Sequence, residues 1–192
     1  MQYNEIIIIG MFAVMFLQMV GFGLFLKVSK RSMGGAPPIN PFVFRVSKAA
    51  MMLTWVALFV QAAGVYDLRM FGRSGKVTML AVLLFNLGAL LQLVSYVYLG
   101  KNLKFGIPGQ DEAWMSTLRT EGIYRFSRNP MYLGFFLMMA GASLYTTNPF
   151  IWALALFATA VHHVIVLREE FFLAGRFGVE WKQYASRVRR YI

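Results

Sequence analysis

Four long stretches without an acidic or basic residue constrain this chain more than any other feature of its sequence. They run from Ile6 to Leu26, from Ala49 to Tyr66, from Val77 to Gly100 and from Asn129 to Leu167. Because about 20 apolar residues are enough for a helix to cross a bilayer, each of the first three stretches predicts one membrane span. The fourth is too long for a single span and fits two.

The middle of the fourth stretch has the residues of a turn. Positions 146–149 read Thr-Thr-Asn-Pro, in which Asn148 can cap a following helix and Pro149 can occupy its first turn. The sequence therefore predicts a helical hairpin with arms Pro130–Tyr145 and Pro149–Leu167. The predicted fold class is an all-α integral membrane protein with five transmembrane helices.

Small residues in the first arm of this hairpin suggest how it packs. Gly134 and Gly141 lie within the arm, and small residues let a neighbouring helix approach closely in a membrane. We therefore expect close helix contact along this arm.

The distribution of lysine and arginine predicts the orientation of the spans. The net charge is +11, and sixteen of the 19 basic residues lie in segments 27–48, 101–128 and 168–190, whereas segment 67–76 holds three. The positive-inside rule then places the N-terminus outside and the C-terminus in the cytoplasm. The basic character follows from this topology and does not require a nucleic-acid partner.

The composition excludes several other classes of protein. Hydrophobic residues make up 58% of the chain and charged residues 14%, against roughly 25% charged residues in soluble domains. An ordinary soluble enzyme, a disordered chain and a basic nucleic-acid-binding domain are therefore excluded. The absence of cysteine removes disulfides, thiol nucleophiles and cysteine-based metal sites.

His162 and His163 are the two histidines, and both lie in the last predicted span. Adjacent helical side chains point about 100° apart, so this pair is poorly arranged to chelate one metal ion, and we expect no metal site. Either histidine can hydrogen-bond a neighbouring helix or take part in function.

Two polar regions meet at the predicted cytoplasmic face, because the hairpin returns the chain to the side on which it began. The first ends in Arg128, where the start of a helix favours an anionic group. Arg128 either binds such a group or anchors the helix end. The second is Glu169-Glu170, two carboxylates near a helix C-terminus, where the helix dipole disfavours them. Nearby arginines compensate them, or they bind a cationic ligand group, or they are exposed and need no compensation.

The C-terminal tail has the pattern of an amphipathic helix. Apolar residues recur at helical spacing, namely Phe177, Trp181, Tyr184 and Val188, among several basic residues. Such a helix would lie on the cytosolic membrane surface or close over the loop that precedes the hairpin.

Motifs on both sides of the hairpin resemble those of a known family. Residues 128–134 read Arg-Asn-Pro-Met-Tyr-Leu-Gly, which resembles the R-H-P-x-Y-x-G motif of the isoprenylcysteine carboxyl methyltransferase (ICMT) family, whose layout phospholipid methyltransferases share. Residues 122–124 resemble its G-x-Y element, and residues 168–190 resemble its E-E-x-x-L…F-G-x-x-Y-x-x-Y tail. Trp181 replaces the first of those tyrosines, and Asn129 stands where the motif has histidine. The resemblance covers roughly residues 95–192.

This resemblance implies an integral membrane methyltransferase that uses S-adenosyl-L-methionine and acts on a lipid-like, membrane-embedded or lipidated acceptor. The predicted spans and this resemblance together divide the chain into an N-terminal three-span region, 1–100, and a region 101–192 that contains the cofactor-binding loop, the hairpin and the tail. We expect the two regions to form one integrated domain. Glu169 or Glu170 would bind the cofactor's ammonium group, and the start of the hairpin would bind its carboxylate. Arg128 and Glu169 are the candidate catalytic residues. The candidate cofactor-binding residues are Gly122, Ile123, Tyr124, Asn129, Pro130, Tyr132, Leu133, Glu169 and Glu170.

Two other interpretations compete with a methyltransferase. The first is an NADPH-dependent membrane enzyme like the sterol reductases, which have similar C-terminal features but usually more spans. The second is a small non-enzymatic membrane protein, for which polar residues near the middle of the bilayer would be expected. Here the charged residues collect at the predicted cytosolic face instead. The sequence leaves the methyl acceptor and the oligomeric state open.

Overall fold

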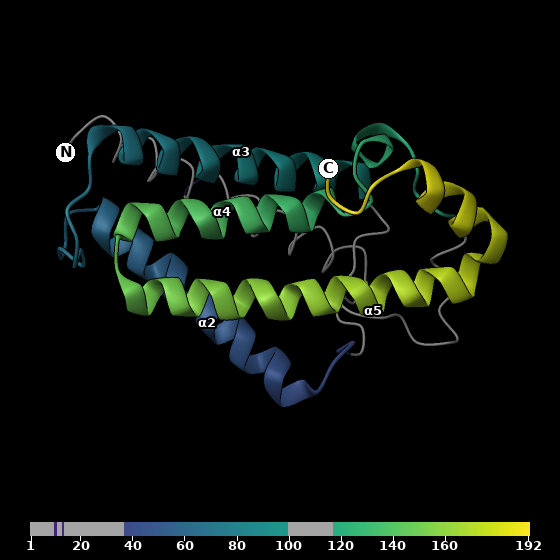
Figure 1. Cartoon of the computed structure of the whole chain (residues 1–192), viewed down its shortest axis with the longest axis horizontal. Helices are drawn as coiled ribbons and strands as arrows, with labels where there is room; N and C mark the ends of the chain where they lie inside the picture. Colours follow the sequence, from purple (N-terminus) through teal and green to yellow (C-terminus); the bar gives the residue numbers. More distant parts are fainter. Residues whose placement is uncertain (1–9, 11–12, 14–36, 100–116) are drawn as a thin grey trace.

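Helices are the only regular secondary structure in the residues that the computed structural model of the protein describes, which are 37–99 and 117–192 together with Gly10 and Ala13 (Figure 1). The elements are α2 (Pro41–Ala62), α3 (Gly75–Leu99), the short 3-10 helix η2 (Gly122–Arg125), α4 (Pro130–Thr146) and α5 (Pro149–Arg187). The predicted span Ile6–Leu26 and most of the loop 101–128 lie outside the described residues.

Three of these helices, α2, α3 and α5, are long and apolar enough to cross a membrane. Helix α3 closely matches the third charge-free stretch, but α2 begins at Pro41, well before the second stretch. The reason is local: the Asn40 side chain accepts hydrogen bonds from the backbone N–H groups of Phe42 and Val43, which starts the helix there. The full set of five spans remains a prediction.

The structure confirms the helical hairpin. Helices α4 and α5 are joined at Thr147 and Asn148, and Asn148 Oδ1 accepts hydrogen bonds from the N–H groups of Phe150 and Ile151 at 3.0 and 3.4 Å. Thr147 takes the left-handed conformation that ends α4, with φ of 42°. Asn148 therefore caps α5 and Pro149 occupies its first turn, as the sequence predicts.

The second arm differs from its predicted end at Leu167, because α5 continues to Arg187. The charged residues that end the apolar stretch are good helix formers, so they end the membrane-compatible segment without ending the helix. The helical axis breaks at Gly178, whose φ of 50° and ψ of −114° are not helical. A helical segment thus continues beyond the kink to Arg187, with Phe177 before the kink and Val188 extended after the helix. The amphipathic tail helix at the cytosolic membrane surface remains a prediction.

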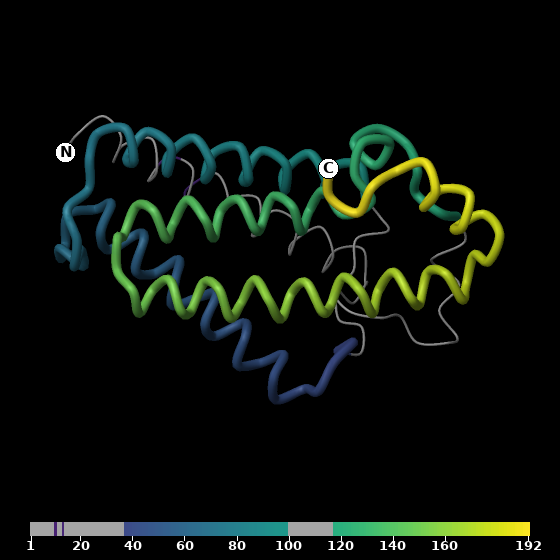
Figure 2. The backbone as a smooth tube through the Cα atoms, viewed as in Figure 1, coloured from purple at the N-terminus to yellow at the C-terminus, as the bar shows by residue number. Residues whose placement is uncertain are grey.

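Helix α4 packs most closely against α3, and the two run side by side in Figure 2. A Cβ atom added at Gly134 would lie 2.5 Å from the carbonyl oxygen of Gly88, and one added at Gly141 would lie 2.7 Å from that of Ala81. These distances are too short for a side chain, so the predicted close contact along the first hairpin arm is confirmed.

The buried apolar side chains form two clusters around α4. One joins α2, α3 and α4 and includes Leu58, Phe85 and Met138. The other joins α2, α4 and α5 and includes Phe135 and Ala158. Helix α4 is thus covered by all three longer helices, and α2 crosses α5 obliquely (Figure 1).

The segment between α2 and α3 caps the hairpin turn. Thr147 Oγ1 donates a hydrogen bond to the carbonyl of Phe71 at 2.9 Å, and Asn148 Nδ2 donates one to that of Leu68 at 2.6 Å. Arg73 donates a hydrogen bond to the carbonyl of Tyr145. These bonds use the polar groups at this end of the bundle, and the residues predicted to carry chemistry lie at the other end.

Candidate functional site

The C-terminal tail folds back onto the start of α4. Beyond the kink in α5 the chain turns, and its last residues return toward α4 (Figure 2). The backbone N–H groups of Arg128 and Asn129 donate hydrogen bonds to the carbonyls of Arg189 and Arg190, at 3.0 and 3.1 Å. The hydroxyl of Ser127 donates a third bond to the carbonyl of Arg190 at 3.2 Å. The two regions that resemble family motifs are therefore in direct contact.

Glu170 is the centre of this contact. Its carboxylate accepts hydrogen bonds from Arg128 Nε at 3.1 Å, from Asn129 Nδ2 at 2.8 Å and from Arg190 Nε at 3.0 Å. The side chains of Arg128 and Glu170 are only 12% and 10% exposed. Two guanidinium groups and an amide thus neutralise and satisfy one buried carboxylate, as buried charges require.

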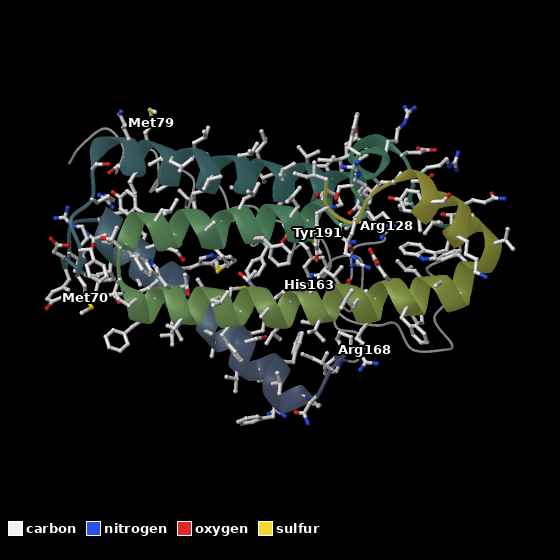
Figure 3. The ribbon with its side chains drawn as sticks, viewed as in Figure 1. Met70, Met79, Arg128, His163, Arg168 and Tyr191 are labelled. Atoms are coloured by element: carbon white, nitrogen blue, oxygen red, sulfur yellow. The ribbon has the colours of Figure 1, made fainter. Side chains whose placement is uncertain are left out.

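The remaining donors of Arg128 bind the tail. Arg128 Nη1 donates to the carbonyl of Ala185 at 2.8 Å and to that of Val188 at 3.1 Å, and the guanidinium lies 5.8 Å from the centre of the Trp181 ring. Figure 3 shows Arg128 in the space between the ends of α4 and α5, whereas Arg168 points away on the other side of α5. Arg128 and Arg190, and not the adjacent Arg168, are the arginines that pair with Glu170.

Glu169 has different neighbours from Glu170. Its Oε1 accepts a hydrogen bond from the Tyr132 hydroxyl at 2.9 Å. The Tyr132 ring lies 6.4 Å between centroids from that of His162, which contacts Lys48 of α2. The Glu169 side chain is half-buried. One glutamate of the pair therefore belongs to a network of arginines, and the other contacts a tyrosine that lies next to the His162–Lys48 pair.

His162 lies on the same side of α5 as Glu169. Its Nδ1 lies 2.7 Å from the carbonyl of Ala158 and its Nε2 lies 3.2 Å from Lys48 Nζ, while the Phe135 ring packs against it at 4.4 Å between centroids. In the sequence, Lys48 is one of the basic residues of segment 27–48 that predict the orientation of the spans. A lysine at the edge of an apolar stretch gave no signal that it turns inward.

Three tyrosines anchor the tail. The Tyr184 hydroxyl donates to the backbone carbonyl of Tyr124 at 2.6 Å, and burial raises the pKa of Tyr124 well above its usual value. The Tyr191 hydroxyl lies 2.7 Å from His163 Nδ1, and burial raises the pKa of Tyr191 to about 12. The phenols of Tyr124 and Tyr191 therefore stay neutral at physiological pH.

The predicted site residues thus fall into three groups at one end of the bundle. The first group lies around Glu170 and the second around Glu169, as described. The third is η2, which carries Gly122 (φ of 59°), Ile123 and Tyr124, and which the Tyr184 side chain contacts. Pro130 and Leu133 lie in the first turn of α4 between these groups.

His163 contacts the tail and does not join His162. No cluster of three or more histidines or carboxylates that could hold a metal ion occurs in residues 37–99 and 117–192. Among the described groups, Glu169 is the carboxylate best placed to bind a cationic ligand group, because the arginines already neutralise Glu170.

Comparison with known proteins gives a family and one relative of known activity. A sequence model of phospholipid methyltransferases matches residues 77–180, which is more than half of the chain and runs from α3 into the last part of α5. The protein-S-isoprenylcysteine O-methyltransferase A of Arabidopsis thaliana is 39% identical over 74 residues, which are 37% of this chain and 36% of the relative. The match thus spans only about a third of that relative. No solved structure matches the chain.

Proposed function

The chain belongs to the phospholipid methyltransferase family, and from that premise we propose that this membrane methyltransferase takes its methyl group from S-adenosylmethionine and transfers it to a lipid or lipidated acceptor. The three long apolar helices support a location in the membrane. The partial similarity to a protein-S-isoprenylcysteine O-methyltransferase supports a lipidated acceptor.

The observation that carries the proposal is the different environment of the two adjacent glutamates. Glu170 is neutralised by Arg128 and Arg190, whereas Glu169 accepts a hydrogen bond from the neutral hydroxyl of Tyr132. Glu169 is therefore suited to bind the ammonium group of the cofactor. A charge-assisted hydrogen bond of this kind contributes about 1.5–3 kcal/mol.

The remaining cofactor contacts are assigned to the elements around Glu169. The cofactor supplies a methyl group activated by attachment to a sulfonium, so the protein has to position the two reactants and stabilise their charges. Asn129, which precedes α4, and the first turn of that helix, with Pro130, Tyr132 and Leu133, would hold the carboxylate and part of the adenosine. Residues 122–124 of η2 would complete the adenosine site.

The contacts of Arg128 support a positioning role for this residue. Its donors are directed to Glu170 and to two carbonyls of the tail, so it joins the start of α4 to α5 and to the C-terminus. A direct contact between Arg128 and an anionic acceptor remains a prediction. We place this site at the cytoplasmic face, as the distribution of basic residues indicates.

Calorimetric titration of the detergent-purified protein with S-adenosylhomocysteine, using NADPH as the comparator, tests this proposal. We expect S-adenosylhomocysteine to bind with a micromolar dissociation constant and NADPH to give no signal. Binding of NADPH alone would favour a reductase. Binding of neither ligand to folded protein would refute a cofactor site at this position and favour a non-enzymatic role.

A further inference from the structure

A lysine from outside the region matched by the family reaches the candidate site. Lys48 lies on α2, before the matched residues 77–180. Its Nζ is 3.2 Å from His162 Nε2 and 5.2 Å from the centre of the Phe44 ring. His162 in turn lies on the same side of α5 as Glu169. The Lys48 side chain is half-buried, so this lysine faces the bundle and not the surroundings.

His162 is arranged to hold the lysine as a hydrogen-bond acceptor. The carbonyl of Ala158 can only accept a hydrogen bond, so the 2.7 Å contact assigns a proton to His162 Nδ1. The Nε2 atom of the neutral ring is then an acceptor, and it takes an N–H of the Lys48 ammonium. The packing of Phe135 against the ring keeps this orientation.

Glu169 needs a cation near it to remain charged inside the bundle. A carboxylate removed from water is costly unless an opposite charge and hydrogen bonds compensate it. Tyr132 supplies a hydrogen bond but no charge, and Arg128 and Arg190 are paired with the neighbouring Glu170. Lys48 is a cation that the structure places on this side of α5, because it contacts His162 at 3.2 Å. His162 lies seven residues before Glu169 and so shares its face of the helix.

We infer that Lys48, held by His162, is a positioning residue that keeps Glu169 charged and oriented to bind the ammonium group of the cofactor. This inference rests on the proposed function. It extends the site to α2, which lies outside the matched segment, and it gives the buried histidine a definite task. Helices α2 and α4 then contribute Lys48 and Tyr132 to the subsite, and α5 contributes Glu169 together with the His162 that holds Lys48.

The test compares a ligand that has the charged amino-acid portion with one that lacks it. S-adenosylhomocysteine carries an ammonium and a carboxylate group, whereas 5′-methylthioadenosine has the same adenosine and thioether but neither of these charges. In Lys48→Gln we expect the affinity for S-adenosylhomocysteine to fall about tenfold and the affinity for 5′-methylthioadenosine to stay the same. Lys48→Arg, which keeps the charge, should restore binding of S-adenosylhomocysteine.

Arg45→Gln is the matched control. Arg45 lies on the same helix, is exposed, and donates a hydrogen bond to the carbonyl of Pro41 at 3.3 Å. The variant loses the same charge without touching the site, so both affinities should remain at the wild-type level. A loss in this variant equal to that in Lys48→Gln would attribute the effect to the overall charge and overturn the inference.

Three other results with Lys48→Gln would overturn the inference that Lys48 positions Glu169. An equal loss of both ligands in Lys48→Gln would indicate a purely structural role, and tighter binding of S-adenosylhomocysteine would mean that Lys48 competes with the ligand for Glu169. Unchanged binding would mean that Lys48 is not needed. Each of these results overturns the inference while the proposed function stands, whereas failure of the wild-type protein to bind S-adenosylhomocysteine would refute the proposed function itself.

Discussion

Replacing each glutamate of the adjacent pair by glutamine should separate ligand binding from stability. Glu169→Gln removes the charge proposed to bind the cofactor's ammonium, but its amide oxygen can still accept the hydrogen bond from Tyr132. The loss of a charge-assisted hydrogen bond, about 1.5–3 kcal/mol, corresponds to an affinity for S-adenosylhomocysteine that is lower by about 10- to 150-fold. The melting temperature should change little.

Glu170→Gln should give the opposite result. The change breaks the buried pair with Arg128, which costs about 3–5 kcal/mol, because it leaves a guanidinium buried without its counter-charge. The pair with Arg190 adds only about 0–1 kcal/mol, since the Arg190 side chain is 37% exposed. A loss of about 3 kcal/mol lowers the melting temperature of a chain of this length by roughly 6–12 °C.

Thermal unfolding in detergent, followed by tryptophan fluorescence, and calorimetric titration well below the melting temperature measure the two quantities on the same preparations. We expect Glu169→Gln to be stable and weak in binding, and Glu170→Gln to be unstable with the smaller loss of affinity. A stable Glu170→Gln that binds less tightly than Glu169→Gln would refute the reasoning, because the two glutamates would then have exchanged roles.

Two further predictions concern the tail and the packing of the hairpin. Deletion of residues 188–192 removes the carbonyls that accept the backbone N–H groups of Arg128 and Asn129, so thermal unfolding should show a loss of several degrees, and limited proteolysis should cut near η2. Gly134→Ala should lower stability by about 1–3 kcal/mol, since its Cβ would lie 2.5 Å from a carbonyl of α3. Gly175→Ala on α5 is the control and should be neutral or stabilising, because its added Cβ would meet nothing within 4 Å beyond the backbone of its own helix.

The hairpin could be predicted from the sequence because its determinants are local. The cap at Asn148, the proline that follows and the glycines of α4 act within a few residues or across one helix contact. The extent of α5 could not be predicted from hydropathy, which marks where a helix can lie in lipid and not where it ends. The change of direction at Gly178 depends on a single left-handed residue, and a glycine in a helical pattern does not reveal that conformation.

The location of the candidate site followed from topology, but its internal arrangement did not. Which arginine compensates Glu170 depends on the tail returning to α4, a contact between residues about sixty positions apart. The nearest arginine in sequence, Arg168, is exposed. Lys48 was missed for a similar reason, because only the crossing of α2 over α5 places it beside His162.

Two pairs of adjacent polar residues on α5 explain how one helix can both line the proposed binding site and hold the C-terminal tail. Residues seven apart in a helix lie within about 20° of each other, whereas adjacent residues are separated by about 100°. His162 and Glu169 therefore share a stripe that faces Lys48 and Tyr132, and His163 and Glu170 share a stripe that faces the tail, through Tyr191 and Arg190. Substitutions on the first stripe should change ligand affinity, and substitutions on the second should change stability. The same seven-residue spacing thus keeps the proposed binding surface separate from the contacts that hold the C-terminus in place.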